Sequence, residues 1–178
     1  RDRSNAVKDI LKSAIEKLKS EGIVPCLATV LVGDDPASAT YVKNKHNACE
    51  KIGIKTKDHK LSANATQKEL DEIIDNLNND NEVHGILVQL PLPNQLNEFA
   101  TISRISPIKD VDSLTPQNAG LLSMGKSILK PCTPSGIIEM FYYYKINLEG
   151  KNVVMINRSN LIGKPLYHLL LQNNATVI

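Results

Sequence analysis

Tyr41 and Lys45 place a phenol and an amine four residues apart, directly after a predicted strand and turn. On a helix this spacing puts two side chains on one face. A tyrosine and a lysine held in this way can share a proton and hold one substrate atom between them. The same pair is also typical of a solvated helix face with a half-buried ring. The residues in the neighbouring segments are needed to distinguish these two interpretations.

Buried strands are predicted on both sides of the pair. Continuous apolar runs at 27–32 and 83–90 are typical of strands covered on both faces, and a further strand is predicted at 54–61. Strands that alternate with helices predict a parallel α/β unit with right-handed crossovers. In such sheets, ligands bind beyond the carboxyl ends of the strands.

Capping signals mark the helices of this unit. Ser38 is predicted to be the N-cap of a helix that ends at Ile52, before Gly53. Thr66 and Glu69 form a capping box that opens the next helix. An apolar stripe at helical spacing predicts a first helix that ends before Gly22: Val7, Ile10, Leu11, Ala14 and Leu18. The helix after the capping box is expected to bury a stripe of Leu70, Ile73, Ile74 and Leu77.

Gln89 is a polar residue at the end of an apolar strand, where a binding site is expected. A buried amide without a partner costs about 1 to 3 kcal/mol, so its side chain must bond either a neighbouring loop or a ligand. Pro91 and Pro93 follow at once and stiffen the loop, which suits a site more than a connector.

A second polar cluster surrounds Val111. If the segment is extended, Asp110 and Asp112 point to the same side. No third oxygen ligand follows at the spacing of a calcium loop, so a metal site is not favoured. A single carboxylate that grips a pair of N–H groups on a ligand is the better use.

The sequence of the C-terminal part predicts a helix, a strand and a polar loop that leads into a second helix. Thr133 is expected to cap a helix that has Pro134 in its first turn, and 152–156 is expected to be a buried strand. The polar loop 157–165 then opens another helix. A strand, a loop with glycine and a helix form the arrangement that places backbone N–H groups and a helix N-terminus against a phosphate. The motif is short of a full G-x-G-x-x-G.

Composition limits the possible partners. The 178 residues carry a net charge of +2 with scattered basic residues, five tyrosines and two phenylalanines, so nucleic acid is not an expected partner. The three cysteines and four histidines lack zinc-site spacing, and no disulfide framework or metal is expected. No apolar run reaches the roughly 18 residues of a membrane helix, so no membrane partner is expected.

Five motifs in one order carry a resemblance to a known family. They are Thr40 to Lys45, Val88 to Pro93, Lys109 to Asp112, Pro131 to Pro134 and Arg158 to Pro165. Together they resemble the methylenetetrahydrofolate dehydrogenase/methenyltetrahydrofolate cyclohydrolase family over nearly the whole chain. The resemblance implies an α/β fold: an N-terminal parallel-sheet folate-binding domain at 1–131, and the beginning of a Rossmann-type dinucleotide-binding domain at 132–178. It also implies a site in the cleft between the domains and a homodimer.

The implied reaction has two steps. A nicotinamide cofactor takes a hydride from 5,10-methylenetetrahydrofolate, and water opens the methenyl product to 10-formyltetrahydrofolate. By resemblance, Lys45 handles the proton in hydrolysis, Tyr41 stacks on or bonds the folate, and Gln89 tunes Lys45. Pro91 would line the substrate site. Asp112 would grip the amino and ring N–H groups of the pterin.

The cofactor would be held by the loop after the last strand, through Asn157, Arg158, Ser159, Gly163 and Pro165. An arginine beside the adenosine ribose favours a 2′-phosphate, so NADP is expected rather than NAD. Two residues depart from the family pattern. Asn157 and Ser113 stand where glycine is usual, which predicts weakened cofactor binding and a changed loop path after Asp112.

Three alternatives differ from this interpretation. One is a folate-binding or cyclohydrolase-only protein without a functional dinucleotide domain, and another is a non-catalytic interaction domain. The third is a short-chain dehydrogenase, which shares the Tyr-x-x-x-Lys spacing but places it after its cofactor loop. A Rossmann domain needs on the order of 100 residues beyond Ile178. Because Arg1 is not a methionine, an organellar targeting segment stays possible beside the cytoplasmic location that we expect.

Overall fold

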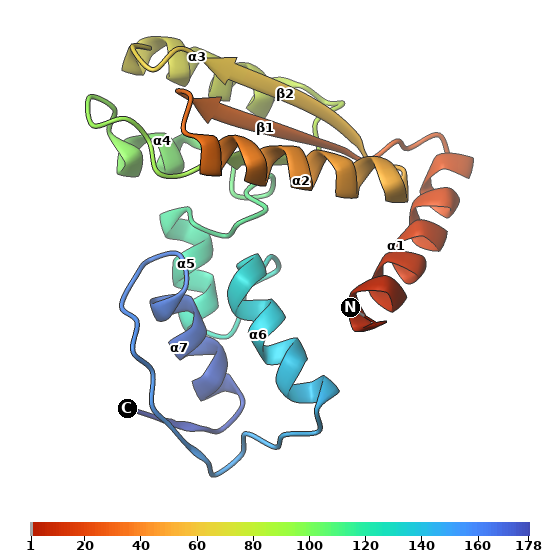
Figure 1. Ribbon diagram of the computed structural model, residues 1–178, viewed down its shortest axis with the longest axis vertical. Helices are drawn as coiled ribbons and strands as arrows, with labels where there is room; N and C mark the ends of the chain where they lie inside the picture. Colours follow the sequence, from red (N-terminus) through yellow and green to blue (C-terminus); the bar gives the residue numbers. More distant parts are fainter. Residues whose placement is uncertain (1) are drawn as a thin grey trace. The chain divides into compact units, whose positions relative to one another are not determined.

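The computed structural model describes residues 2–178 and divides them into two compact units (Figure 1). The first unit ends at Lys109 and the second runs from Asp110 to Ile178. The domain boundary expected at 131 stays a prediction. Each unit is described by itself below.

The first unit is built on a three-stranded parallel sheet. Strands β1 (Cys26–Val32), β2 (Lys55–Leu61) and β3 (Gly85–Val88) lie in the order β2-β1-β3. Cys26 of β1 is opposite Lys55, and Leu27 is opposite Gly85. The predicted strands are confirmed, although β3 is shorter than 83–90 because its ladder with β1 covers only four residues.

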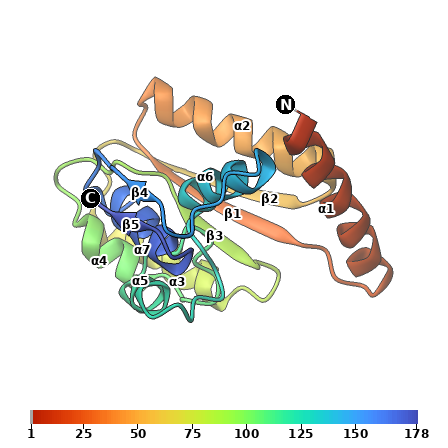
Figure 2. The ribbon, with the colours of Figure 1, turned by 90° about the horizontal axis from the view of Figure 1, so that it is seen from below.

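Two helices cover the two faces of this sheet. Helices α2 (Pro36–Ile52) and α3 (Gln67–Asn79) lie on opposite faces (Figures 1 and 2). Since β2 and β3 flank β1 on opposite sides, right-handed crossovers require this arrangement. The chain adds β2 on one side of β1 and then β3 on the other, while all three strands stay parallel. The carboxyl ends of β1 and β3 therefore form the switch point at which such sheets bind ligands.

The start of α2 differs from the prediction. The N-cap is Asp35, whose Oδ2 accepts the Ser38 amide at 2.7 Å, and Ser38 lies inside the helix and is buried. This bond lowers the pKa of the Asp35 carboxyl. Pro36 occupies the first helical position, which suits its fixed φ and missing N–H. The predicted end is confirmed, because Gly53 is left-handed with φ 88°.

Helix α3 begins with the predicted capping box. Thr66 accepts the Glu69 amide, and Glu69 accepts the Thr66 amide. Its inner stripe is confirmed, with Leu70, Ile74 and Leu77 buried and Ile73 partly buried.

The other end of α3 is closed by a lysine from far along the chain. Lys109 Nζ donates to the carbonyls of Leu77, Asn78 and Asp80 at 2.8–3.0 Å. This contact joins α3 to the last residue of the first unit.

Helix α1 (Asp2–Ser20) has a largely uncovered apolar stripe. The helix is confirmed, and Gly22 is left-handed beyond its end. Ile15 is buried, but Val7, Ile10 and Leu11 are exposed. The periodicity therefore predicted the helix but not a buried face. In the part of the chain that the structure describes, no helix is both long enough and apolar enough to cross a membrane.

The second unit packs helices α5 (Pro116–Ser123), α6 (Cys132–Tyr143) and α7 (Gly163–Gln172) around one apolar core. Strands β4 (Asn152–Val153) and β5 (Thr176–Val177) pair in parallel. The strand predicted at 152–156 is shorter because β5 offers only two partners. Its predicted burial is wrong, since Val154 and Ile156 are exposed. Thr133 was also wrongly predicted as a cap, since α6 begins at Cys132 without a side-chain cap.

Candidate functional site

The candidate site lies at the switch point of the first unit. Strand β1 ends at Val32 and leads through the turn 33–35 into α2, while β3 ends at Val88 and leads into Gln89. Gln89 N donates to Val30 O at 2.9 Å, so the loop after β3 leaves the sheet beside β1. Helix α2 therefore starts at the same sheet edge as the loop that carries Gln89.

Lys45 and Gln89 meet across this edge. Lys45 is half-buried, and its Nζ donates to Gln89 Oε1 at 3.3 Å. Gln89 Nε2 donates to Leu90 O at 2.8 Å, which turns the amide oxygen toward the lysine. The partner expected for the partly buried Gln89 amide is thus the side chain of Lys45, 44 residues away. The lysine keeps further N–H donors for a ligand.

Tyr41 lies one helical turn before Lys45 on α2 and is 62% exposed. Within residues 2–178 its hydroxyl forms no hydrogen bond, including none to Lys45. A phenol ring with its face and hydroxyl both accessible can stack on a planar ligand and also bond it. The predicted helical spacing is confirmed, and the sharing of a proton stays a prediction.

Pro91 follows Gln89 in a fixed loop. The Leu90–Pro91 peptide is cis, and Pro91 is exposed. Further along, Gln95 Nε2 donates to Ala63 O at 2.6 Å, which ties the loop to the segment after β2. The loop thus presents an apolar ring beside Gln89, as a substrate-lining role requires.

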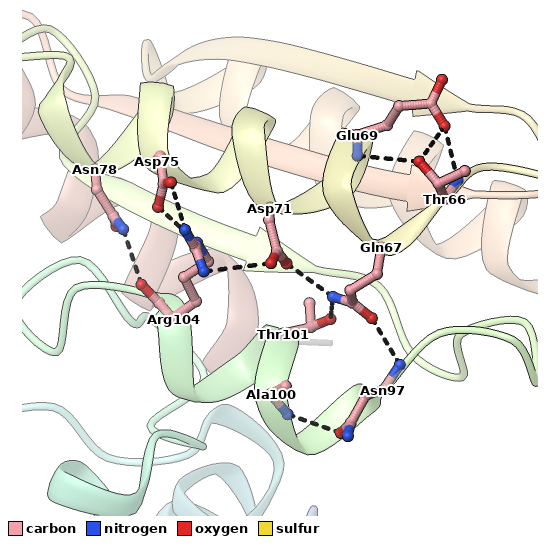
Figure 3. A network of polar contacts seen from close by, with 10 residues as sticks. All are labelled: Thr66, Gln67, Glu69, Asp71, Asp75, Asn78, Asn97, Ala100, Thr101 and Arg104. Carbon is pink, nitrogen blue, oxygen red and sulfur yellow. Dashed lines mark hydrogen bonds and ion pairs between the residues drawn. The ribbon is translucent and has the colours of Figure 1, made fainter.

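A polar network fixes the helix that follows this loop (Figure 3). Arg104 of α4 (Glu98–Arg104) donates to both carboxylate oxygens of Asp75 at 2.7 Å. Gln67 donates to Asp71 and Thr101, and its Oε1 accepts the Asn97 amide at 2.8 Å. The Arg104 guanidinium lowers the pKa of the Asp75 carboxyl. Helix α4 is therefore held on α3 by directed polar contacts.

The aspartates at 110 and 112 have different environments. Asp110 is 1% exposed, and its Oδ2 accepts the Thr115 amide at 2.8 Å and Asn118 Nδ2 at 3.0 Å. Val111 and Asp112 form a turn rather than an extended segment, so the expected common orientation is wrong. Asp112 is half-buried. Sequence reasoning missed the structural use of Asp110, and the following Thr115-Pro116 helix start was the available signal.

Ser113 has the backbone conformation that glycine favours. Its φ is 57°, and its hydroxyl donates to Leu129 O at 2.6 Å. The changed loop path expected from this serine is therefore not required, because the side chain accepts the left-handed geometry with a bond of its own.

The loop 157–165 is closed by its own side chains. Asn157 Oδ1 accepts the Ser159 amide at 2.9 Å. The Ser159 hydroxyl accepts the Ile162 and Gly163 amides at 3.0 and 3.4 Å, and its carbonyl accepts the Lys164 amide at 3.0 Å. The first amides of α7 are thus already used. Among the described residues, the loop amides of Arg158, Asn160 and Leu161 have no such partner and can meet an anion.

Gly163 is required by this loop. A Cβ at that position would lie 2.5 Å from Asn157 O and 2.7 Å from Asn157 Oδ1. Gly163 and Pro165 are buried, whereas Arg158 is exposed and forms no ion pair within residues 2–178. A free guanidinium beside unbonded loop amides fits a phosphate group. Within the same residues, no group of three or more acidic, histidine or cysteine side chains is arranged to hold a metal ion.

An α/β unit with polar groups at its switch point, followed by a nucleotide-type loop, defines a two-part ligand-binding protein. Residues 1–112 match the tetrahydrofolate dehydrogenase/cyclohydrolase catalytic domain, and residues 131–178 match the NAD(P)-binding domain of the same enzymes. The chain therefore belongs to the tetrahydrofolate dehydrogenase/cyclohydrolase family, and residues 131–178 belong to its Rossmann-type NAD(P)-binding part.

Individual relatives agree with this assignment. The bifunctional protein FolD of Nitrosopumilus maritimus is 73% identical over 175 residues, which cover 98% of this chain and 61% of that protein. The crystal structure of the bifunctional dehydrogenase/cyclohydrolase FolD from Campylobacter jejuni has a TM-score of 0.98 at 46% identity and covers all of this chain and 64% of that one.

A third similar protein is FolD from Trypanosoma brucei, solved in complex with NADP cofactor and inhibitor. It has a TM-score of 0.97 at 34% identity, over 100% of this chain and 61% of that one. The chain thus spans 61% of the length of the first curated relatives that it matches.

Replacing Gly163 by alanine is expected to open the loop 157–165, because Cβ and the Asn157 backbone cannot occupy the same space. Amide hydrogen exchange at Ser159, Ile162 and residue 163 should rise at least about tenfold. The control is Gly136→Ala, where a Cβ meets no atom within 4 Å. Equal exchange in the two variants would contradict the close approach.

Proposed function

We propose that the protein oxidises 5,10-methylenetetrahydrofolate with NADP and hydrolyses the methenyl product to 10-formyltetrahydrofolate. The observation that carries the proposal is the Lys45–Gln89 contact at the switch point, in a chain of the tetrahydrofolate dehydrogenase/cyclohydrolase family. The match of residues 131–178 to an NAD(P)-binding domain favours this activity over a cyclohydrolase-only or folate-binding protein. The family also argues against a short-chain dehydrogenase or an interaction domain.

The oxidation step needs positioning more than acid or base catalysis. NADP, when bound, supplies the hydride acceptor. The residues of this chain would hold the folate, with the exposed Tyr41 ring against its planar part and Pro91 beside it. Asp112 would accept the amino and ring N–H groups of the pterin in a charge-assisted pair.

The hydrolysis step needs a proton acceptor. Water bonds to the methenyl carbon and loses a proton, which leaves a hydroxyl on that carbon. The bond between the carbon and the pterin nitrogen then breaks as the hydroxyl gives up its proton to form the formyl carbonyl and the nitrogen takes a proton. Lys45 is the group that would take this proton or hold the new hydroxyl. Gln89 orients it, because the Gln89 oxygen accepts from Nζ while the Gln89 amide group is fixed on Leu90 O.

NADP is proposed over NAD because of Arg158. This side chain is exposed, and among the described residues it has no carboxylate partner, so its charge is available to a 2′-phosphate. The relative from Trypanosoma brucei was solved with NADP. Asn157, Ser159, Gly163 and Pro165 would shape the loop that receives the cofactor. The homodimer and the cytoplasmic location stay predictions.

Lys45→Met should lower the rate of methenyl hydrolysis by about 10²- to 10⁴-fold, because the proton acceptor is lost. Hydride transfer should remain measurable. Both are followed in the full-length protein by the absorbance of the methenyl product, with NADP and NAD in parallel. Lys43→Met, an exposed lysine on the same helix, is the control. Hydrolysis that persists at the control rate would remove Lys45 from the mechanism.

Asp112→Ala should raise the KM for the folate substrate by about 10-fold or more, since a hydrogen-bonded charged group contributes about 1.5 to 3 kcal/mol. The KM for NADP should change less than about twofold. Asp112→Asn, which keeps the shape and removes the charge, should give an intermediate value. A change confined to the NADP constant would mean that the pterin assignment is wrong, and thermal melting checks that the variants fold.

Arg158→Ala should raise the KM for NADP by about 10-fold and leave the KM for NAD nearly unchanged, because only NADP carries the 2′-phosphate. Lys164→Ala removes an exposed cation from the same loop and serves as control. If both nucleotides weaken equally, Arg158 does not select between them.

A further inference from the structure

A polar cluster lies between α2 and the sheet, where apolar packing is the rule. Thr29 on β1 and Asp58 on β2 are opposite each other, and the Thr29 hydroxyl donates to Asp58 Oδ1 at 2.6 Å. His46 of α2 reaches this pair, with Nδ1 2.7 Å from Asp58 Oδ2 and 2.8 Å from the Thr56 hydroxyl. We call these four residues and Glu50 the α2 anchor.

The second ring nitrogen of His46 is also bonded. Nε2 lies 3.1 Å from Glu50 Oε1, one turn further along α2. Two carboxylates on the two nitrogens match an imidazolium, in which both nitrogens donate. The hydrogen bond to Asp58 accordingly raises the pKa of His46, partial desolvation opposes the rise, and Glu50 adds to it. A neutral ring would lose one of its two donated bonds.

The α2 anchor matters because α2 has little other fixed packing. Of the residues Pro36–Ile52, all of which the structure describes, only Ser38 is buried. Apolar contacts of half-exposed side chains resist rotation of a helix weakly, since they are not directional. The bond from His46 to Asp58 is directional and links α2 to a strand, and Thr29, which is 1% exposed, fixes Asp58 from the other side.

Rotation of α2 would directly misplace Lys45. Side-chain ends lie about 5 to 6 Å from a helix axis, so a turn of about 20° moves them by roughly 2 Å. The Lys45–Gln89 bond is 3.3 Å long and would not survive such a shift. Misplacement of a catalytic group by about 1 Å can cost about 10²-fold in rate.

We propose that His46 is a positioning residue for Lys45: through Asp58 and Glu50 it fixes the rotation of α2 and so holds the amine at Gln89. The inference rests on the proposed role of Lys45 in hydrolysis. His46 neighbours Lys45 in sequence but faces the sheet instead of Gln89. It touches neither folate nor cofactor in this role.

The charged groups near the ring define a pH window. Glu50 comes from α2 and Asp58 from β2, whereas β1 contributes the neutral Thr29. Burial is the main cause that raises the pKa of the Cys49 thiol, and the Asp58 carboxylate adds to it. The Lys19 ammonium of α1 lies at the far end of α2, against Gly53.

Because the folded-state pKa of His46 is raised, the stabilisation of α2 by the His46 imidazolium is fully present below the unfolded value of about 6.5. It is lost as the pH rises through the folded value.

The test compares His46→Gln with the wild type in the full-length protein between pH 5.5 and 9. At pH 6, kcat for methenyl hydrolysis should fall about tenfold or more, with KM for the folate changed less than about twofold. The ratio of wild-type to variant kcat should fall toward one as the pH rises, because the neutral ring keeps only one of its two donated bonds. Hydride transfer should change much less.

Two further variants keep the test interpretable. Asp58→Asn should reproduce the pH-dependent ratio even if His46→Gln folds poorly, and thermal melting reports on folding. His59→Gln changes a β2 histidine whose side chain forms no hydrogen bond to the described residues, so its ratio should stay near one at every pH.

Several results would overturn the inference. A ratio that is constant across the pH range, or equal loss of both activities, would leave His46 with a general structural role only. If Lys45→Met abolishes hydrolysis while His46→Gln matches the wild type, the positioning role fails and the proposed function stands. If Lys45→Met retains hydrolysis, the proposed function fails first and this inference falls with it.

Discussion

The hydrogen bond between Lys45 and Gln89 depends on the whole first unit. Its two side chains come from a helix and from a strand end that are 44 residues apart. They meet because β2 and β3 flank β1, so that α2 and the loop after β3 begin at one sheet edge. A bond of 3.3 Å between flexible groups tolerates little movement of either support. The two supports of this bond are α2, which carries Lys45, and the loop after β3, which carries Gln89.

The two supports are fixed in different ways. The loop after β3 is tied to the segment after β2 by Gln95 and ends in α4, which directed polar contacts hold on α3 (Figure 3). Helix α2 is capped at its first turn by Asp35 and at its end by Gly53. Between these ends it contacts the sheet through polar groups more than through buried apolar ones. Polar contacts define orientation, whereas apolar burial mainly defines distance.

Local signals were predictable from the sequence, and partners across elements were not. The capping box at Thr66 and the left-handed Gly53 depend on neighbouring residues, so both predictions are confirmed. Asp35 was missed in favour of Ser38 because both side chains can cap a helix, although Pro36 at the first helical position indicated Asp35. Strand lengths were overestimated where the ladder is short, with four residue pairs between β1 and β3 and two between β4 and β5.

The site shows the same division. The alternating pattern of strands and helices placed Gln89 at the carboxyl end of a strand, but the strand order that brings Lys45 beside it came only from the structure. The bond between Asp58 and His46 joins β2 to α2, and no repeating pattern in the sequence indicates that these two side chains meet. Likewise, the stripe of Val7, Ile10 and Leu11 has helical spacing, but spacing does not specify whether a partner covers it.

Ser113 has a consequence for how variation in this family is tolerated. A left-handed backbone costs a residue with a side chain about 1 to 2 kcal/mol, and one intramolecular hydrogen bond returns about 0.5 to 1.5 kcal/mol. The bond from the Ser113 hydroxyl to Leu129 O therefore offsets most of the strain at φ 57°. A left-handed position can thus accept serine at little net cost where the hydroxyl finds an acceptor, so the absence of glycine there does not require a different backbone path.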